Sequence, residues 1–486
     1  MVIERCITLG IVEQIVSFGN DLLWSYVLII LLIVLGLYFT FRTKFVQFRL
    51  IGEMVRLLGE GTHVSKDKKK SVSSFQAFCI STASRVGTGN MAGVAIAISL
   101  GGPGAVFWMW LIALIGSASG FVESTLAQIY KVKDGSSFRG GPAYYMEKAL
   151  GQRWMGILFS ILITLCFGLV FNAVQTNTMA LAFENAYSID RGVFGIIIVA
   201  CLALIIFGGI KRIAQVTQWI VPIMAVAYIL VAMFVMLINF KMIPSVFSLI
   251  FSEAFNFEAL ASGGLGAAMM EGIKRGLFSN EAGMGSAPNA AATADVTHPV
   301  KQGLIQAMGV FTDTLLVCSS TAFIILFSKS YTSGNLEGIE LTQHALSSQV
   351  GPWATNFVAI TILLFAFSSL IGNYYYGETN IEFINQRKIW VFLYRLAVLG
   401  MVLFGAHAQI DIVWNMADLF MGTMALVNLI AIMLLGKYAF AALQDYIHQK
   451  KEGKNPVFTR NSIPGLKNVE CWEEEDTQNQ QSANQA

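Results

Sequence analysis

Apolar segments of about 20 residues, separated by short polar loops, make up most of the chain. An α-helix of that length crosses the hydrocarbon core of a bilayer. We predict an all-α multi-pass membrane protein with about eleven transmembrane helices. Their approximate ranges are 18–41, 74–100, 104–130, 154–183, 193–210, 217–238, 263–290, 303–327, 354–377, 389–409 and 411–436.

Composition supports the membrane interpretation. Charged residues make up 13% of the chain, whereas a soluble domain has about 25%. A large soluble enzyme would not contain so many long apolar segments. Residues 1–450 are predicted to form a single transmembrane domain, and the polar residues 451–486 a disordered cytoplasmic tail.

The distribution of positive charge predicts the orientation. With the N-terminus outside, the cytoplasmic loops and tail hold 24 Lys and Arg residues, and the outer segments hold four. Cytoplasmic loops are normally richer in Lys and Arg than outer loops. We therefore expect a protein of the cell membrane with its C-terminus in the cytoplasm. The basic run "KDKKK" at 66–70 fits a solvated loop beside anionic headgroups, and we expect no nucleic-acid partner.

Two of the apolar segments are interrupted by small and polar residues. They are "STASRVGTGNMAG" at 81–93 and "FSNEAGMGSAPNAAA" at 278–292. If the first segment, 18–41, is an extra helix, each interruption lies in the first helix of a set of five, about 74–210 and 263–436. Interrupted helices at matching positions of two halves are the sequence sign of a transporter's central site.

A broken helix offers specific chemistry. The carbonyl groups of one half-helix can bind a bare cation, and the amide groups of the other suit a carboxylate. One zwitterion and one sodium ion can therefore be held with few formal charges. The alternative for glycine-rich segments is close packing of helices, but two interruptions in register with polar side chains favour a binding site.

Three motifs carry a family resemblance: "VGTGN", "GGPAYYMEKALG" at 140–151 and "GLFSNEAGMGSAPNAAATADVTHPVKQG" at 276–303. They resemble the alanine/glycine:cation symporters, also called sodium:alanine symporters, of the amino acid–polyamine–organocation superfamily. The resemblance covers roughly residues 20–450. It implies a LeuT-type fold with five-plus-five inverted repeats and one extra N-terminal helix. It also implies sodium-driven import of small neutral amino acids by alternating access.

The resemblance and the two interruptions together suggest the substrate-binding residues. We expect the backbone amides and the Asn side chain of the first interruption to bind the substrate's carboxylate. The second interruption would supply backbone contacts, and Gln175, by resemblance, would touch the substrate. The alternative for Gln175 is a hydrogen bond between helices. The candidates are Thr88, Gly89, Asn90, Gln175, Gly283, Met284 and Gly285.

A sodium site is expected at Ser368 and Ser369. In LeuT-type folds a hydroxyl pair at this place completes a sodium site with carbonyls of the first broken helix. By position those carbonyls belong to Ala83 and Val86, with another from Phe365. Oxygen ligands with little formal charge suit sodium as the co-transported ion. The alternative is that both hydroxyls bond back to their own helix.

Asn373 departs from the family pattern. Alanine-type members place a bulky Trp where this chain has Asn373. An amide is smaller than an indole and offers both a donor and an acceptor. We therefore expect a larger or more polar substrate, such as glutamine or serine, beside or in place of alanine.

Charged residues at membrane depth are costly, so each one needs a partner or a function. Arg85 and Glu281, next to the two interruptions, are candidates for a gate or for ion coupling. Lys274 and Arg275 either line a vestibule or pair with Glu271. The remaining candidates are Glu123, Asp313 and Arg395.

The sequence also bears on three other functions. A proton-coupled amino-acid permease is the main alternative, and Glu281 is its coupling candidate. An enzyme is disfavoured because the chain has no HExxH or GxSxG motif and no paired Asp within a span. A channel is disfavoured because no filter loop repeats.

Overall fold

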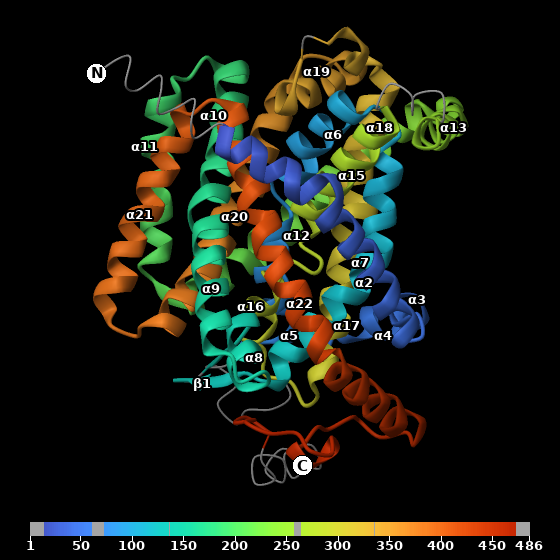
Figure 1. The fold of residues 1–486 in the computed structure, drawn as a ribbon. Coiled ribbons are helices and arrows are strands. Elements are labelled where there is room, and N and C mark those ends of the chain that lie inside the picture. The colour runs from blue at the N-terminus through green and yellow to red at the C-terminus, as the bar shows by residue number, and fades with distance from the viewer. Residues whose placement is uncertain (1–13, 61–71, 136, 257–263, 335, 473–486) are drawn as a thin grey trace.

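The computed structural model describes residues 14–60, 72–135, 137–256, 264–334 and 336–472. Its helices pack side by side into a bundle, with α19 at one end and α8 and the C-terminal segment at the other (Figure 1). We call these the α19 end and the α8 end. The helices before residue 239 are α2 (Leu28–Arg42), α3 (Val46–Arg49), α4 (Ile51–Leu58), α5 (Ser74–Arg85), α6 (Val94–Gly101), α7 (Ala105–Ile129), α8 (Pro142–Lys148), α9 (Arg153–Ile163), α10 (Asn172–Tyr187), α11 (Arg191–Ile206) and α12 (Gly209–Ile238).

The second half of the chain is also helical. Its helices are α13 (Ile243–Ala254), α15 (Gly264–Asn280), α16 (Ala287–Ala291), α17 (Pro299–Phe311), α18 (Ser319–Ser328), α19 (Gly338–Val350), α20 (Trp353–Ile384), α21 (Lys388–His407) and α22 (Ile410–Lys451). Wider π-helical turns occur at Leu23–Val27, Gly89–Gly93, Thr164–Phe171 and Thr312–Cys318. Short 3₁₀ turns occur at Phe240–Met242, Ser330–Ser333 and Arg460–Ser462. Two antiparallel strands, β1 (Val132–Asp134) and β2 (Ser137–Arg139), form a hairpin with Val132 opposite Arg139.

Eight helices of the described chain are long and apolar enough to cross a membrane: Gln14–Arg42, Ala105–Ile129, Arg153–Tyr187, Gln215–Ile238, Pro299–Ser328, Trp353–Ile384, Lys388–His407 and Ile410–Lys451. They correspond to eight of the eleven predicted spans. A ninth span, 193–210, appears as the shorter α11. The other two, 74–100 and 263–290, are the interrupted ones, and each is divided into two helical pieces.

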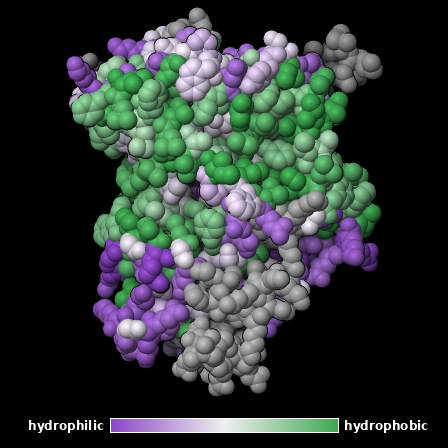
Figure 2. Space-filling view, turned by 180° about the vertical axis from the view of Figure 1, so that it is seen from behind, coloured by the Kyte–Doolittle hydropathy of each residue, from purple (hydrophilic) through white to green (hydrophobic). Residues whose placement is uncertain are grey.

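The surface separates by polarity along the bundle. Figure 2 shows a broad hydrophobic band around the middle and hydrophilic residues gathered toward the ends. Large apolar side chains such as Trp219, Leu230 and Leu434 are exposed, while polar side chains such as Asn90 and Glu281 are buried. Apolar side chains on the surface and polar side chains in the interior are what a hydrocarbon solvent favours.

The C-terminal segment differs from the prediction. Helix α22 continues to Lys451 rather than ending near residue 436, because Phe440, Leu443 and Tyr446 remain buried against the bundle. The expected disorder from residue 451 is wrong for residues 453–472, which fold back onto the α8 end (Figure 1). Residues 473–486 lie outside the described part of the chain.

Few but well-placed apolar residues explain why this polar segment is ordered. Phe458 and Trp472 are buried and pack edge to face, with ring centroids 5.3 Å apart. The Trp472 indole donates to the carbonyl of Gln128 at 3.0 Å, and the Lys131 ammonium lies 4.9 Å from the Trp472 ring. Burial lowers the pKa of Lys131 to about 8. The segment's overall polarity concealed these anchors.

We expect Trp472→Ala to release residues 453–472. The change removes an indole hydrogen bond, a cation–π contact and a buried ring, and truncating a buried aromatic residue costs about 3–5 kcal/mol. Hydrogen exchange of the segment should therefore rise while the helices stay protected. Lys454→Ala, at an exposed position of the same segment, is the matched control. Equal protection in Trp472→Ala and the native chain would contradict this account.

Candidate functional site

The first interruption is a short non-helical stretch between α5 and the π-helical turn that begins α6. At its start Val86 is extended (φ −78°, ψ 91°). The amide of Gly87 donates to Asn90 Oδ1 at 2.9 Å, and the amide of Thr88 donates to Gln175 Oε1 at 3.0 Å. Side chains thus replace the missing helical acceptors, as buried backbone requires.

Position 87 requires a glycine because of its close neighbours and not because of its backbone conformation. A Cβ atom there would lie 2.3 Å from Ser369 Oγ and 2.8 Å from Gln175 Oε1. Real Cβ atoms do not approach so closely. The glycine therefore allows α20 and α10 to approach the first interruption.

The second interruption lies between α15 and α16. Its backbone is left-handed at Glu281 (φ 57°), Gly283 (φ 83°) and Gly285 (φ 87°). The Glu123 carboxylate of α7 accepts from the amides of Gly283 at 3.1 Å and Gly285 at 3.0 Å. Asn428 of α22 donates to Glu123 Oε2 at 2.8 Å and to the Gly283 carbonyl at 2.9 Å. One carboxylate and one amide thus satisfy the freed backbone.

The five oxygen atoms expected for sodium come together between α5 and α20. Ser368 Oγ lies 3.4 Å from the Ala83 carbonyl oxygen and 2.8 Å from that of Phe365. Ser369 Oγ lies 3.4 Å from the Val86 carbonyl oxygen and 3.1 Å from that of Phe365. The hydroxyls also bond back to their own helix through Phe365, which was the alternative from the sequence. The arrangement is compatible both with a sodium site and with hydroxyls that only bond back to their own helix.

Asn90 holds the protein's own backbone together. Its carboxamide oxygen accepts from Gly87, and its nitrogen donates to Asp313 Oδ1 at 2.6 Å. Asp313 Oδ2 accepts from Ser279 Oγ at 2.8 Å. The negative Asp313 carboxylate attracts the NH₂ group of Asn90. Contact between the Asn90 side chain and the substrate's carboxylate stays a prediction.

Gln175 forms the interhelical hydrogen bond that the sequence offered as the alternative to substrate contact. Met284 is fully buried, and its amide donates to the Glu281 carbonyl at 3.2 Å. Gly89 lies against Phe278, because a Cβ there would be 2.9 Å from the Phe278 ring. Contact of these residues with a substrate stays a prediction.

Aromatic rings stack beside the two interruptions. Phe278 packs between Phe171 and Trp414, with centroid distances of 4.4 and 4.7 Å. Trp414 also lines a cavity of about 140 Å³, together with Ile96, Ser99, Leu100, Arg275, Glu337, Ile410, Asp411 and Asn415. We call this cavity the vestibule; the ring stack meets it at Trp414.

The charges of α15 pair with α22. Arg275 donates to both oxygens of Asp418, at 3.0 and 2.8 Å, and to Glu271 at 3.3 Å. Lys274 lies 3.8 Å from Glu271 and 3.9 Å from Asp418. Both expectations for this pair hold in part, since Arg275 also lines the vestibule. Asp418 was not anticipated, because its partner is more than 140 residues away.

Arg85 has a different environment from the one expected of a gate. Its Nη1 donates to the Gln306 carbonyl at 3.2 Å. Its Nε and Nη2 are buried with no hydrogen-bond partner among the described residues. The guanidinium balances nearby carboxylates electrostatically without forming an ion pair with Glu281. Its role in gating or coupling stays a prediction.

Asn373 and Glu281 meet through Ser84. Ser84 Oγ lies 2.7 Å from Glu281 Oε1 and 2.7 Å from Asn373 Oδ1. Glu281 Oε2 accepts from Ser286 Oγ at 2.6 Å. The structure therefore brings Asn373 of α20 into the same polar cluster as both interruptions.

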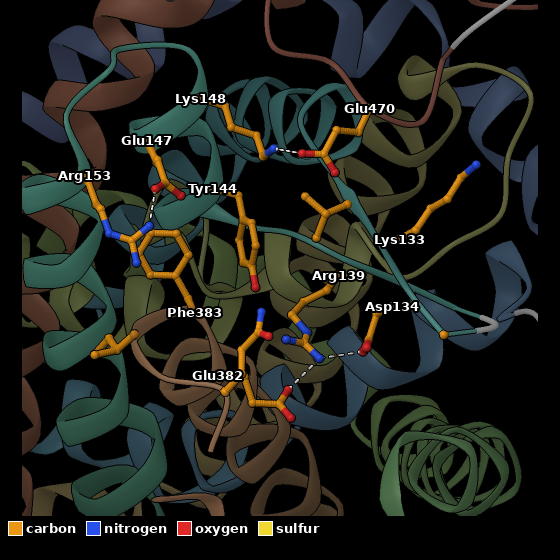
Figure 3. A pocket seen from close by; sticks show the side chains of 14 residues that line it. Lys133, Asp134, Arg139, Tyr144, Glu147, Lys148, Arg153, Glu382, Phe383 and Glu470 are labelled. Carbon is orange, nitrogen blue, oxygen red and sulfur yellow. Dashed lines mark hydrogen bonds and ion pairs between the residues drawn. The ribbon is translucent and has the colours of Figure 1, made fainter. Parts of the chain in front are cut away.

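A larger cavity, of about 690 Å³, lies at the α8 end and does not contain these residues (Figure 3). Arg139 lies between Asp134 and Glu382 there, at 2.7 and 2.9 Å. Arg153 pairs with Glu147, and Lys148 with Glu470. Its charges satisfy one another across the hairpin, α8, α20 and the C-terminal segment. It is a surface hollow, separate from the candidate site.

Sequence reasoning assigned no role to Glu123 and Asp313, although both were noted as charges at membrane depth. It missed Asn428, Phe278 and Trp414. A carboxylate within an apolar span was the available signal for the first two. Which backbone they bind depends on contacts between distant helices, which one sequence does not reveal.

We expect Gly87→Ala to weaken sodium-dependent substrate binding while the protein remains folded. The added methyl must displace Ser369 or Gln175, and such overpacking costs about 1–3 kcal/mol, enough to weaken binding about tenfold or more. Binding of labelled substrate to purified protein, with thermal unfolding as the folding check, measures this. Gly400→Ala is the matched control, since its Cβ meets nothing within 4 Å. Native-like binding by Gly87→Ala would contradict the close approach.

The chain is similar to the probable sodium/glutamine symporter GlnT of Bacillus subtilis, at 62% identity over 96% of this chain and 97% of the relative. It is also 37% identical to the sodium/alanine symporter AgcS of Methanococcus maripaludis, over 91% of this chain and 99% of the relative.

Among solved structures, a manganese transporter of Eremococcus coleocola shares the fold, with a TM-score of 0.50 at 13% identity over 82% of this chain and 92% of that one. The model of the sodium:alanine symporter family matches residues 9–460. The chain belongs to the sodium:alanine symporter family.

Proposed function

We propose that this sodium-coupled amino-acid symporter imports glutamine and alanine, and that Ala83, Val86, Phe365, Ser368 and Ser369 bind its sodium ion. The observation that carries the sodium assignment is the set of five neutral oxygens between α5 and α20, in which each serine hydroxyl lies 2.8–3.4 Å from two of the carbonyl oxygens. Hard, uncharged oxygen ligands suit a monovalent cation.

The same oxygen set argues against a proton in place of sodium. Carbonyls and hydroxyls do not bind a proton near neutral pH, and the five ligands include no carboxylate. A proton-coupled permease would use a titratable group outside this set, and Glu281 is the candidate from the sequence. Sodium is therefore the ion that fits this oxygen set.

The substrate's backbone fits the first interruption. Thr88 Oγ1 is buried with no hydrogen-bond partner among the described residues. It lies at the N-terminal end of the half-helix Gly89–Gly101, whose dipole favours a carboxylate. In this arrangement Asn90 and Asp313 position the interruption, Gln175 and Gly89 line it, and Gly283, Met284 and Gly285 form the opposite wall.

Asn373 directs the choice of side chain. Its Nδ2 is buried without a hydrogen-bond partner in the described structure, so an amide donor is available beside the interruptions. A substrate with a side-chain oxygen can accept from it. The 62% identical relative is a probable sodium/glutamine symporter, which supports this choice.

The finer architecture belongs to the same proposal. We infer eleven spans, with the inverted repeats at about 74–210 and 263–436 after the extra helix 18–41, in the cell membrane. The excess of Lys and Arg at the α8 end supports placing that end in the cytoplasm. The vestibule near α19 then faces outward, and the ring stack meets it at Trp414.

The proposed coupling is tested by uptake into proteoliposomes. Labelled glutamine and alanine should accumulate with an inward sodium gradient, and not with potassium and an inward proton gradient. Accumulation driven by the proton gradient alone would overturn the sodium assignment.

Ser368→Ala and Ser369→Ala should each raise the half-saturating sodium concentration. A lost hydroxyl ligand to a charged group costs about 1.5–3 kcal/mol, which is roughly tenfold or more. Ser320→Ala is the control, since its hydroxyl bonds only within α18 and the turn before it. Unchanged sodium dependence in both variants would remove these residues from the ion site.

A further inference from the structure

Ser84 lies between two acceptor atoms, which raises a question of hydrogen counting. Its Oγ is 2.7 Å from Glu281 Oε1 and 2.7 Å from Asn373 Oδ1. All three residues are nine-tenths or more buried. A hydroxyl has one hydrogen, so it cannot donate to both oxygens at once.

Two arrangements satisfy these distances. In the first, Glu281 is protonated and donates to Ser84 Oγ, and Ser84 donates to Asn373 Oδ1. The Nδ2 group of Asn373 then faces away from Ser84, where it has no hydrogen-bond partner in the described structure. In the second, Glu281 is ionised, Ser84 donates to it, and the Asn373 amide turns so that Nδ2 donates to Ser84. The Asn373 oxygen then faces away.

We propose that Glu281, Ser84 and Asn373 form a relay in which a proton on Glu281 sets which atom of the Asn373 amide is presented to the substrate. With the proton bound, Asn373 offers a donor, and without it an acceptor. The switch turns one amide group and moves no helix. The proton comes from water when the site is open to one side of the membrane, and sodium remains the driving ion.

The inference rests on the proposed function, because it needs the substrate's side chain to reach Asn373. A side-chain carbonyl is matched by the donor and therefore by protonated Glu281. Glutamine cannot report the switch, because its own amide carries both an acceptor and a donor and can turn to match either state. A glutamine analogue with a methyl ketone in place of the amide has only the acceptor. Alanine has no polar side chain and is indifferent to the state of Asn373. The relay thus makes binding of a substrate with only a side-chain acceptor depend on pH, while alanine provides an internal reference.

The surroundings of Glu281 are compatible with either protonation state. Its other oxygen accepts from Ser286 at 2.6 Å. Titratable and charged groups near it on the neighbouring elements are Arg85 of α5, Cys166 of the turn before α10, Asp313 of the turn before α18 and Tyr376 of α20. Glu123 accepts hydrogen bonds from the amides of Gly283 and Gly285.

The experiment is equilibrium binding to the purified full-length protein, in saturating sodium, from pH 5 to pH 9. Binding of labelled alanine is measured directly, and binding of the methyl-ketone analogue by its displacement of labelled alanine. The quantity of interest is the ratio of the two dissociation constants. The shared amino and carboxylate groups and the sodium site cancel in this ratio. We expect the ketone analogue to weaken relative to alanine by up to tenfold per pH unit once Glu281 loses its proton, as one-proton linkage requires.

Variants assign that dependence to the relay. Glu281→Gln fixes the neutral form, so the ratio should stay at its acidic value across the range. Ser84→Ala cuts the connection and should also flatten the profile. Ser81→Ala, on the same helix and bonded only to the carbonyl of Phe78, should keep the native profile. If Glu281→Gln does not fold, Ser84→Ala decides the question.

Two results would overturn the relay: a flat ratio in the native protein, or a native-like profile in Glu281→Gln or, if that variant does not fold, in Ser84→Ala. Failure to bind either amino acid would instead contradict the proposed function. In that case the infrared carbonyl band of a protonated carboxylic acid, compared between the native protein and Glu281→Gln at pH 5, tests the relay by itself. Absence of a difference between the two spectra would overturn it.

Discussion

Backbone groups that leave a helix inside a bilayer must find partners within the protein, and this constraint determines the centre of the molecule. No lipid atom can replace the lost acceptors, and each unsatisfied group costs several kcal/mol. The second interruption meets the requirement with the Glu123 carboxylate and the Asn428 amide. The first meets it with Asn90 and Gln175. The polar residues buried in this apolar chain therefore stabilise two gaps in its helices.

The same gaps create the chemistry. Ending α5 at Arg85 frees the carbonyls near Ala83 and Val86, and the Ser368 and Ser369 hydroxyls face them from α20. Gly87 allows the approach, because any side chain there would collide with Ser369. The result is a cluster of neutral oxygens rather than a carboxylate cage. Neutral oxygens of this kind suit a monovalent ion that must also be released, which is the role proposed for the cluster.

The central charges fall into two groups with different tasks. Lys274, Arg275, Glu271 and Asp418 neutralise one another near the vestibule. Deeper in the bundle, Arg85 is accompanied by the carboxylates of Glu123, Glu281 and Asp313. Glu123 accepts three hydrogen bonds, and Asp313 holds Asn90. Glu281 is connected instead to Asn373, beside the proposed substrate.

The sequence was sufficient to locate both interruptions, eight long spans and the serine pair, because each leaves a local signature of small, apolar or hydroxyl residues. It was insufficient where partners come from distant helices. The Asn90–Asp313 contact joins residues that are 223 positions apart, and it gives Asn90 a partner within the protein. The order of residues 453–472 depends on two aromatic anchors, Phe458 and Trp472, in a segment whose average composition is polar. Tertiary contacts decide such cases, and one sequence does not contain them explicitly.

The central claim is that the two interruptions form one site in which sodium and amino acid bind together. Reciprocal binding to the purified protein tests it most directly: glutamine affinity is measured with and without sodium, and sodium affinity with and without glutamine. Thermodynamic linkage requires the two enhancement factors to be equal, and we predict a factor of about ten or more in each direction. Glutamine and sodium affinities that are independent of each other would contradict the account.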